Sequence, residues 1–240
     1  MRAVLRWIAL LLVGLLALQL FFVLRIALMA WWNPASTAFE RSQMWSIWQQ
    51  GVSHRPWQQQ WVDYAHISTF LKQAVLTAED DGFVGHDGVQ WEAIERAWER
   101  NQQAQEKALA SKTPDKPVKI YGGSTITQQL AKNLLLSGER SLLRKGQELL
   151  LAHALELLLD KRRILELYLN HVEWGQGIFG AEAAAQHYYR KTAQHLSASE
   201  AARLAVMLPR PRYYEQHPQS RYLQSRARSI QRRMAATVVP

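Results

Sequence analysis

A long apolar run opens the chain. Trp7–Leu24 contains a single fully polar residue, Gln19, and a second apolar run, Ile26–Trp32, follows Arg25. This length approaches or reaches the span of a bilayer, and the Arg25 side chain can extend its charge toward one surface. The pattern predicts a transmembrane anchor within residues 1–35.

Flanking residues orient this anchor. Arg2 and Arg6 precede it, which favours a cytoplasmic N-terminus, and Trp31 and Trp32 suit the opposite interface. A cleaved signal peptide is the competing interpretation, but its apolar region is normally shorter, and the one candidate cleavage triplet, at 36–38, comes late. We expect an uncleaved anchor, with the rest of the chain outside the cytoplasmic membrane.

Residues 36–66 follow as a membrane-proximal aromatic segment. Trp45, Trp48, Trp57 and Trp61 stand there among glutamines and arginines. Such amphipathic aromatics suit a segment that lies close to the membrane surface. Ordinary packing onto the domain explains them equally well.

From residue 67 onward, apolar positions recur every three or four residues, which is typical of helices. The first helix follows a possible cap at Ser68 and ends at Glu79. A second begins near Trp91 and gives way to the polar, proline-containing stretch Asn101–Lys119, which we expect to be a mobile loop.

Side-chain caps mark the later helices. Thr125 with Gln128, and Ser197 with Glu200, have the spacing of capping boxes, and Ser141 can cap a long helix. Further helices are expected over Ile164–Asn170, Ala181–Tyr189 and Ser220–Ala236. No segment alternates convincingly as a strand, so the predicted fold class is mainly α: one helical domain, 67–240, behind one transmembrane helix.

Composition adds a charge asymmetry. The net charge is +9, and Arg203–Pro240 holds eight arginines against one acid, Glu215. Phospholipid headgroups, a pyrophosphate or nucleic acid would suit this basic end. The chain has no cysteine, which excludes disulfides and thiolate zinc sites.

The first candidate site is Ala78–Gly88, where four acids and one histidine fall within eleven residues. Carboxylates this close repel one another, which raises their pKa values toward the range of a general base. Glu79 also meets the negative end of a helix macrodipole, which acts in the same direction. A solvated acidic turn and a calcium loop are the alternatives.

The second candidate is the polar helix start Gly122–Asn133. Two glycines lead into this helix, and free N–H groups at a helix N-terminus bind anions. Lys132 lies two turns after Thr125 on the same face, so a cation and polar groups converge. Arg144 and Glu148, taken alone, are most simply a surface ion pair.

The order of these motifs resembles the peptidoglycan glycosyltransferases of bacterial cell-wall synthesis, specifically the monofunctional, membrane-anchored biosynthetic transglycosylases. The matching motifs are Glu79-Asp80-x-x-Phe83-x-x-His86-x-Gly88, Gly122–Asn133, Arg144-Lys145-x-x-Glu148, Ile164-Leu165-Glu166-x-Tyr168-Leu169-Asn170, and the run from Gly177 to Lys191. The resemblance covers about residues 67–215 and implies a lysozyme-like helical domain.

The resemblance implies that lipid II is polymerised into β-1,4-linked glycan and that undecaprenyl pyrophosphate leaves. Glu79 would take the proton from the acceptor's 4-hydroxyl, and Glu148 would be a second catalytic glutamate near the donor. The implied substrate-binding residues are Asp80, His86, Ser124, Thr125, Gln128, Gln129, Lys132, Asn133, Arg140, Arg144, Lys145 and Lys191. The basic members would stabilise the pyrophosphate, because negative charge develops on it.

The resemblance also implies that no cofactor is required, with a divalent cation, Mg²⁺ or Mn²⁺, as a candidate stimulant. The expected partners are lipid II, the growing glycan chain, membrane lipids, and proteins of cell-wall synthesis or division, but not nucleic acid. The expected location is the bacterial inner membrane, with the catalytic domain on the periplasmic side.

Three departures from the family pattern leave the charged groups intact: Tyr189 where phenylalanine is common, Asp81-Gly82 after the acid pair, and Arg210 where asparagine is usual. A lytic transglycosylase or lysozyme-like hydrolase remains the nearest alternative. It would use one glutamate as an acid and would need no site for an anionic leaving group. A non-catalytic anchored module with a decayed site is a second alternative.

Overall fold

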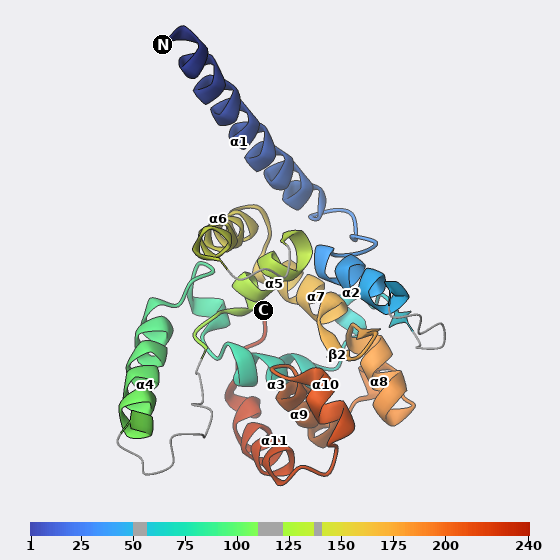
Figure 1. Ribbon diagram of the computed structural model, residues 1–240. Helices are drawn as coiled ribbons and strands as arrows, with labels where there is room; N and C mark the ends of the chain where they lie inside the picture. The colour runs from blue at the N-terminus through green and yellow to red at the C-terminus, as the bar shows by residue number, and fades with distance from the viewer. Residues whose placement is uncertain (50–56, 110–121, 137–140) are drawn as a thin grey trace.

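The computed structural model describes residues 1–49, 57–109, 122–136 and 141–240. Figure 1 shows one long helix, α1, projecting from a body that consists mainly of helices. α1 is long and apolar enough to cross a membrane, judged by its length and composition. The prediction of a mainly α fold behind one N-terminal apolar helix is confirmed.

The described helices are α1 (Arg2–Leu28), α2 (Ala38–Gln49), α3 (Thr69–Glu79), α4 (Trp91–Leu109), α5 (Ile126–Leu135), α6 (Leu142–Leu158), α7 (Lys161–His171), α8 (Ala181–Tyr189), α9 (Ala198–Met207), α10 (Pro211–Gln216) and α11 (Arg221–Arg233). Short 3₁₀ turns occur at Tyr64–His66, Phe83–Gly85, Ala193–His195 and Met234–Ala236. The strands are β1 (Gln58–Gln59), β2 (Glu173–Gly175) and β3 (Ile178–Phe179).

Capping side chains start α5, α6 and α9 where the sequence predicts, but the expected cap at Ser68 is not formed, because the Ser68 hydroxyl donates to the Leu196 carbonyl oxygen instead of accepting from α3. At α5, the Thr125 hydroxyl accepts from the Gln128 N–H, and the Gln128 side chain accepts from the Thr125 N–H. Ser197 and Glu200 form the same reciprocal pair at α9, and Ser141 caps α6. These caps satisfy N–H groups that the first helical turn leaves unpaired.

The core lies where two groups of helices meet. α3 packs on α9 and α11, whereas α5 packs on α2, α6 and α7. Their apolar stripes supply the fully buried side chains Leu71, Leu130, Leu151, Leu165 and Leu204. α3 therefore ends, at Glu79, between the two groups.

A small sheet was not expected from the sequence. Its strand order is β1-β3-β2, with β1 parallel and β2 antiparallel to β3. Strands of two or three residues are too short to produce an alternating pattern, so the sequence carries no periodic signal for them. The short helix α10 was also missed.

A buried polar cluster attaches the membrane-proximal segment to the domain. Glu40 of α2 is fully buried, accepts from the Thr37 N–H at 2.7 Å and from Gln59 Nε2 at 3.0 Å, and contacts His171 Nδ1 at 2.9 Å. These contacts join α2 and β1 to the end of α7, far along the chain.

The tryptophans of this segment divide into two kinds. The Trp57 ring lies 4.7 Å from that of Phe179, and Trp61 packs against the core. Trp45 and Trp48 stay exposed, with ring centroids 4.8 Å apart. Packing onto the domain thus accounts for Trp57 and Trp61.

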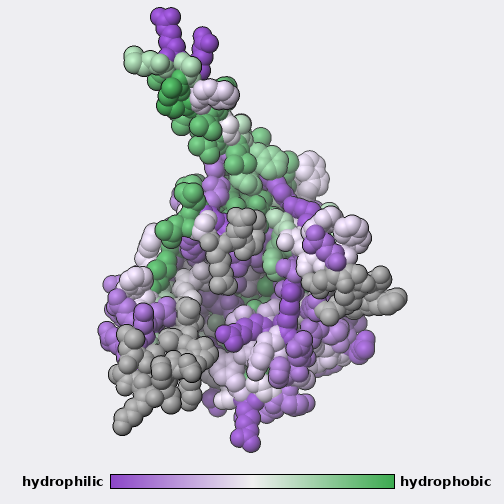
Figure 2. Space-filling model, in the orientation of Figure 1, coloured by the Kyte–Doolittle hydropathy of each residue, from purple (hydrophilic) through white to green (hydrophobic). Residues whose placement is uncertain are grey.

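The last turns of α1 dock on the domain beside α6. Phe22, Ile26 and Met29 are buried, and the amides of Gln19 and Gln147 exchange two hydrogen bonds of 2.9 Å. Figure 2 shows apolar side chains covering α1 and continuing onto the neighbouring face of the body. On α6 the exposed large apolar side chains are Leu142, Leu143, Leu150, Leu157 and Leu158.

Two expectations need correction. α4 continues to Leu109, so the loop predicted from Asn101 is helical in its first nine residues, and the remainder of that stretch lies outside the described residues. The basic helix α11 lies at the end of the body opposite α1 (Figure 1), so phospholipid headgroups around the anchor do not explain its charge.

Candidate active site

Glu79 is the last residue of α3, and its carboxylate is held by α5 and α7. Gln129 Nε2 donates to Glu79 Oε2 at 2.9 Å, and the Tyr168 hydroxyl donates to Gln129 Oε1 at 3.0 Å. Because an ionised carboxylate can only accept hydrogen bonds, the NH₂ group of Gln129 must face Glu79, which leaves the amide oxygen to accept from Tyr168. No described residue donates to the other oxygen, Oε1, so this oxygen can accept a further hydrogen bond.

Burial is the main influence on Glu79. It raises the pKa of the Glu79 carboxyl above the ordinary value of 4.5, and the negative charge of Asp80 acts in the same direction. The hydrogen bond from Gln129 and the charge of Arg226 lower that pKa in part. Burial, followed by the charges of Glu79 and Asp80, raises the pKa of Tyr168 well above its ordinary range, so its hydroxyl stays protonated.

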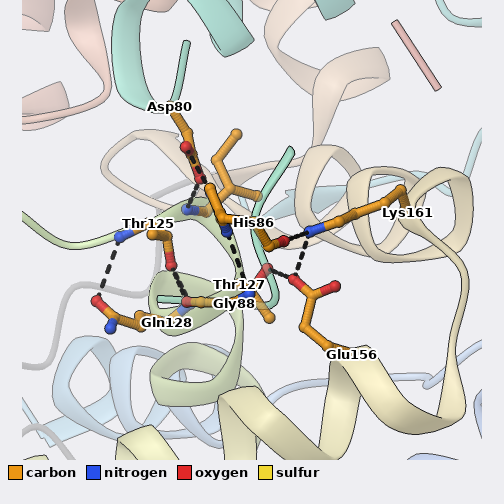
Figure 3. A network of polar contacts seen from close by, with 9 residues as sticks. Asp80, His86, Gly88, Thr125, Thr127, Gln128, Glu156 and Lys161 are labelled. Atoms are coloured by element: carbon orange, nitrogen blue, oxygen red, sulfur yellow. Dashed lines mark hydrogen bonds and ion pairs between the residues drawn. The ribbon is translucent and has the colours of Figure 1, made fainter. Parts of the chain in front are cut away.

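Asp80 is buried and contacts both the start of α5 and the loop that contains His86. Its Oδ2 accepts the Ile126 N–H at 2.9 Å, and its Oδ1 lies 2.8 Å from His86 Nε2 (Figure 3). The Gly88 N–H donates to His86 Nδ1 at 3.1 Å, so the hydrogen of a neutral ring lies on Nε2 and is donated to Asp80. Asp80 and His86 therefore join the end of α3 to the start of α5.

Gly88 has no room for a side chain. Its φ is +84°, and an added Cβ would lie 2.9 Å from Glu156 Cγ and 3.3 Å from the Ala152 carbonyl oxygen. Its own carbonyl accepts from the Thr125 hydroxyl at 2.6 Å. Only glycine lets this loop approach α6 so closely.

A second set of polar contacts, shown in Figure 3, supports the loop that contains His86 and Gly88. Lys161 donates to the His86 carbonyl oxygen and to Glu156 Oε1, the latter at 2.8 Å, and its ammonium lies 4.5 Å from the centre of the Phe83 ring. Thr127 donates to the same Glu156 oxygen at 2.6 Å. The pair Glu156–Lys161 thus holds the His86 loop against α5.

Glu148 is buried in a cluster of cations, not on an open surface. It accepts from Arg144 Nη1 at 2.9 Å and from Lys145, and Lys145 also lies 3.3 Å from the Ser124 hydroxyl. Arg144 Nε is buried without a hydrogen-bond partner among the described residues, as is Gln128 Nε2 at the start of α5. The cluster and Glu79 are joined through α5, since Ser124 precedes it and Gln129 belongs to it.

The remaining candidate residues are more dispersed. Lys132 is exposed and Asn133 half-buried on α5, while Lys191 pairs with Glu200 at 2.8 Å, between α8 and α9. Arg140 lies outside the described residues. The structure therefore brings most of the candidates to the first turns of α5, leaves Lys132 and Asn133 in its second half, and places Lys191 in a separate ion pair.

Two sequence interpretations change. Asp81 points away from Glu79 to Arg233, at 2.9 Å, and both side chains are more than half exposed, so crowding by Asp81 does not perturb Glu79. Asp80 and Asp81 have different partners and do not converge as a calcium loop requires. Within the described residues, no group of three or more potential ligands could hold a metal ion.

Sequence reasoning missed several contributors. Tyr168 lies in a motif that the resemblance marks, but nothing in the sequence places its hydroxyl on Gln129. Arg226 and the pair Glu156–Lys161 act across long separations in sequence. In the sequence, the only indication of Arg226, Glu156 and Lys161 was that each is a polar residue beside apolar positions of its helix.

The chain is similar to known proteins over most of its length. The chain matches a family model described as Transglycosylase over residues 48–235. A protein named biosynthetic peptidoglycan transglycosylase from Herminiimonas arsenicoxydans is 48% identical over 244 residues, covering 100% of this chain and 99% of the relative. Proteins of the same name from Bordetella pertussis (50% identical; 92% and 88% covered) and Janthinobacterium sp. strain Marseille (50%; 94% and 92%) are similarly close.

We expect Lys161→Met to lower the stability of the fold by about 3 kcal/mol, because the buried Glu156 carboxylate loses its countercharge. Thermal unfolding of the purified full-length protein measures this. Lys107→Met, at an exposed lysine of α4, is the matched control and should stay within about 0.5 kcal/mol of wild type. Addition of Glu156→Gln should recover much of the loss, and a double variant as unstable as Lys161→Met would contradict the pairing.

Glu79→Gln should make the protein at least as stable as wild type at pH 8. The raised pKa means that the folded state holds this proton more tightly than the unfolded state does. Ionisation of Glu79 therefore costs stability as pH rises from 4.5 through the raised pKa, and glutamine avoids this cost. Thermal unfolding at pH 5 and pH 8 tests the difference, and parallel pH profiles for the two proteins would contradict it.

Proposed function

The chain belongs to the transglycosylase family, and from this premise we propose that it polymerises lipid II into β-1,4-linked glycan strands for the bacterial cell wall. As a member of this family it is a glycosyltransferase. The observation that carries the proposal is one partly buried carboxylate with a raised pKa, Glu79, joined through α5 to a cluster of cations.

In the proposed reaction, Glu79 is the general base. Its carboxylate takes the proton from the 4-hydroxyl of the acceptor's N-acetylglucosamine. That oxygen then forms a bond to C1 of the N-acetylmuramic acid at the reducing end of the growing chain. The bond between C1 and the pyrophosphate oxygen breaks, and undecaprenyl pyrophosphate leaves with its electron pair.

The surroundings of Glu79 support this role. A base works best when its pKa is close to the operating pH, and burial moves the pKa of Glu79 in that direction. Gln129 donates to one oxygen and so aims the other, while Asp80 and His86 hold the end of α3 in position. Asp80 and His86 are thus positioning residues in the proposal.

The leaving group calls for cations. We propose that Lys132, Arg144, Lys145 and, outside the described residues, Arg140 stabilise the pyrophosphate, since charge develops there in the transition state. Glu148 orients Arg144 and Lys145, because its carboxylate accepts from both. The unpartnered Arg144 Nε and Gln128 Nε2 are donors that a phosphate or sugar oxygen would satisfy.

We propose that Ser124, Thr125 and Asn133 contact sugar or phosphate oxygens and that Lys191 contributes positive charge from the C-terminal side. No resident cofactor enters this chemistry. Divalent cations, where they stimulate, would act on the oxygens of the pyrophosphate. Proteins of cell-wall synthesis or division are proposed partners.

The apolar helix α1 is consistent with a membrane anchor. We propose a cytoplasmic N-terminus and a periplasmic domain, because Arg2 and Arg6 precede the apolar run. Gln19 lies inside that run, so its hydrogen-bonded partner Gln147 and the exposed leucines of α6 would sit at the same depth. A lipid-linked substrate would then meet the site at the membrane surface.

Glu79→Gln should reduce glycan polymerisation from labelled lipid II by at least about a hundredfold, the contribution of a general base. Gel analysis of the glycan product measures this. Glu95→Gln, at an exposed glutamate of α4, is the matched control and should leave polymerisation unchanged.

Equal polymer from wild type and Glu79→Gln would remove Glu79 from the base role. Shortening of pre-made glycan by the wild-type protein would instead favour a lytic enzyme, which uses its glutamate as an acid on a glycosidic bond.

Lys132→Ala should lower polymerisation by about 10²–10³, the typical loss when one group that stabilises developing charge is removed. Its circular dichroism spectrum should match that of wild type, because Lys132 is exposed on α5. Lys107→Ala on α4 is the control. Full activity of Lys132→Ala would contradict the assignment of this lysine to the pyrophosphate.

A further inference from the structure

A pocket of about 360 Å³ lies at the junction between α1 and the domain. It is formed by the last turn of α1, the connection that follows it and the start of α2. Two arginines that are distant in sequence, Arg25 and Arg41, line it together, along with Trp32 and Ser36. It is separate from the residues that surround Glu79.

The positive charge in this pocket has no counterion among the described residues. No acidic side chain lines it, and Arg25 and Arg41 are close enough to repel each other electrostatically. Glu40 precedes Arg41 in the chain, but it faces inward, where Thr37, Gln59 and His171 occupy both of its oxygens. The fold therefore maintains two positive charges side by side.

Arg41 is held in place while most of its donors remain available. Its Nη1 donates to the carbonyl oxygen and to the hydroxyl of Ser36, at 3.1 Å each. The Arg25 guanidinium makes no hydrogen bond with side chains or carbonyl groups in the described part of the chain. Two guanidinium groups offer forked donors that match the oxygens of a phosphate.

The position of the pocket along the bilayer normal indicates which phosphate it can bind. The eighteen residues Trp7–Leu24 rise about 27 Å at about 1.5 Å per residue, close to the roughly 30 Å of a hydrocarbon core. Arg25 therefore emerges at the level of the headgroups. Trp31 and Trp32, 77% and 67% exposed, suit the same interface.

We propose that Arg25 and Arg41 bind the headgroup phosphate of an anionic phospholipid, which is wedged between the anchor and the domain. An anionic lipid is preferred over a zwitterionic one because the pocket carries two positive charges and no acid. The single negative charge of the bound phosphate, placed between the two guanidinium groups, offsets their mutual repulsion and fixes α1 relative to α2. The inference rests on α1 spanning the membrane and not on the polymerisation chemistry.

The test uses the full-length protein, purified in mild detergent after incorporation into vesicles of phosphatidylglycerol and phosphatidylcholine, without any lipid II. Native mass spectrometry counts the lipids retained by each chain. Wild type should retain one phosphatidylglycerol, and Arg25→Gln/Arg41→Gln should lower that occupancy by at least about tenfold, because several charge-assisted hydrogen bonds are lost. Arg221→Gln/Arg228→Gln, at exposed arginines of α11, should retain the lipid as wild type does.

Arg25→Lys/Arg41→Lys keeps the charge and should retain more lipid than the glutamine pair. Loss of lipid from the glutamine pair and the α11 pair alike, or retention by both, would overturn the proposal. Release of the lipid by inorganic phosphate would indicate a general anion site, and release only by undecaprenyl pyrophosphate would indicate a site for the carrier lipid; either result overturns it. Since no substrate is present, the outcome is independent of whether Glu79 acts as a base.

Discussion

A glutamate that serves as a base must be shielded from water enough to hold a proton near neutral pH, yet be ionised when the substrate arrives. Here burial raises the pKa of Glu79, and the amide of Gln129 limits that rise. Tyr168 fixes the amide, and it can do so because its own hydroxyl stays protonated. The balance depends on the packing of α3, α5 and α7, since each contributes one of the three groups.

Much of the architecture followed from local chemistry. The capping boxes at Thr125 and Ser197 predicted the starts of α5 and α9, because those interactions lie within four residues of each other. The end of α3 at Glu79 followed from apolar periodicity. Motif resemblance then supplied the family, which the residues alone left open between synthesis and cleavage of glycan.

The sequence did not reveal what depends on distant contacts. The acidic stretch suggested crowding as the cause of a raised pKa, whereas burial is the larger cause and Asp81 turns outward to Arg233. Glu148 resembled half of a surface ion pair with Arg144, but in the structure it is buried and also accepts from Lys145, which in turn lies beside Ser124. The polar residues after Asn101 suggested a loop, but alanine, glutamine, glutamate and lysine are good helix formers, so α4 runs on to Leu109.

The central claim, that burial raises the pKa of Glu79, is tested most directly by titrating the Glu79 carboxylate itself. Carbon-13 NMR or difference infrared spectroscopy of labelled protein measures this, and Glu79→Gln assigns the signal. The account predicts a midpoint above the ordinary 4.5 and a further upward movement in Gln129→Leu, which removes the hydrogen bond that stabilises the charged form. A midpoint at the ordinary value, unchanged by Gln129→Leu, would contradict it.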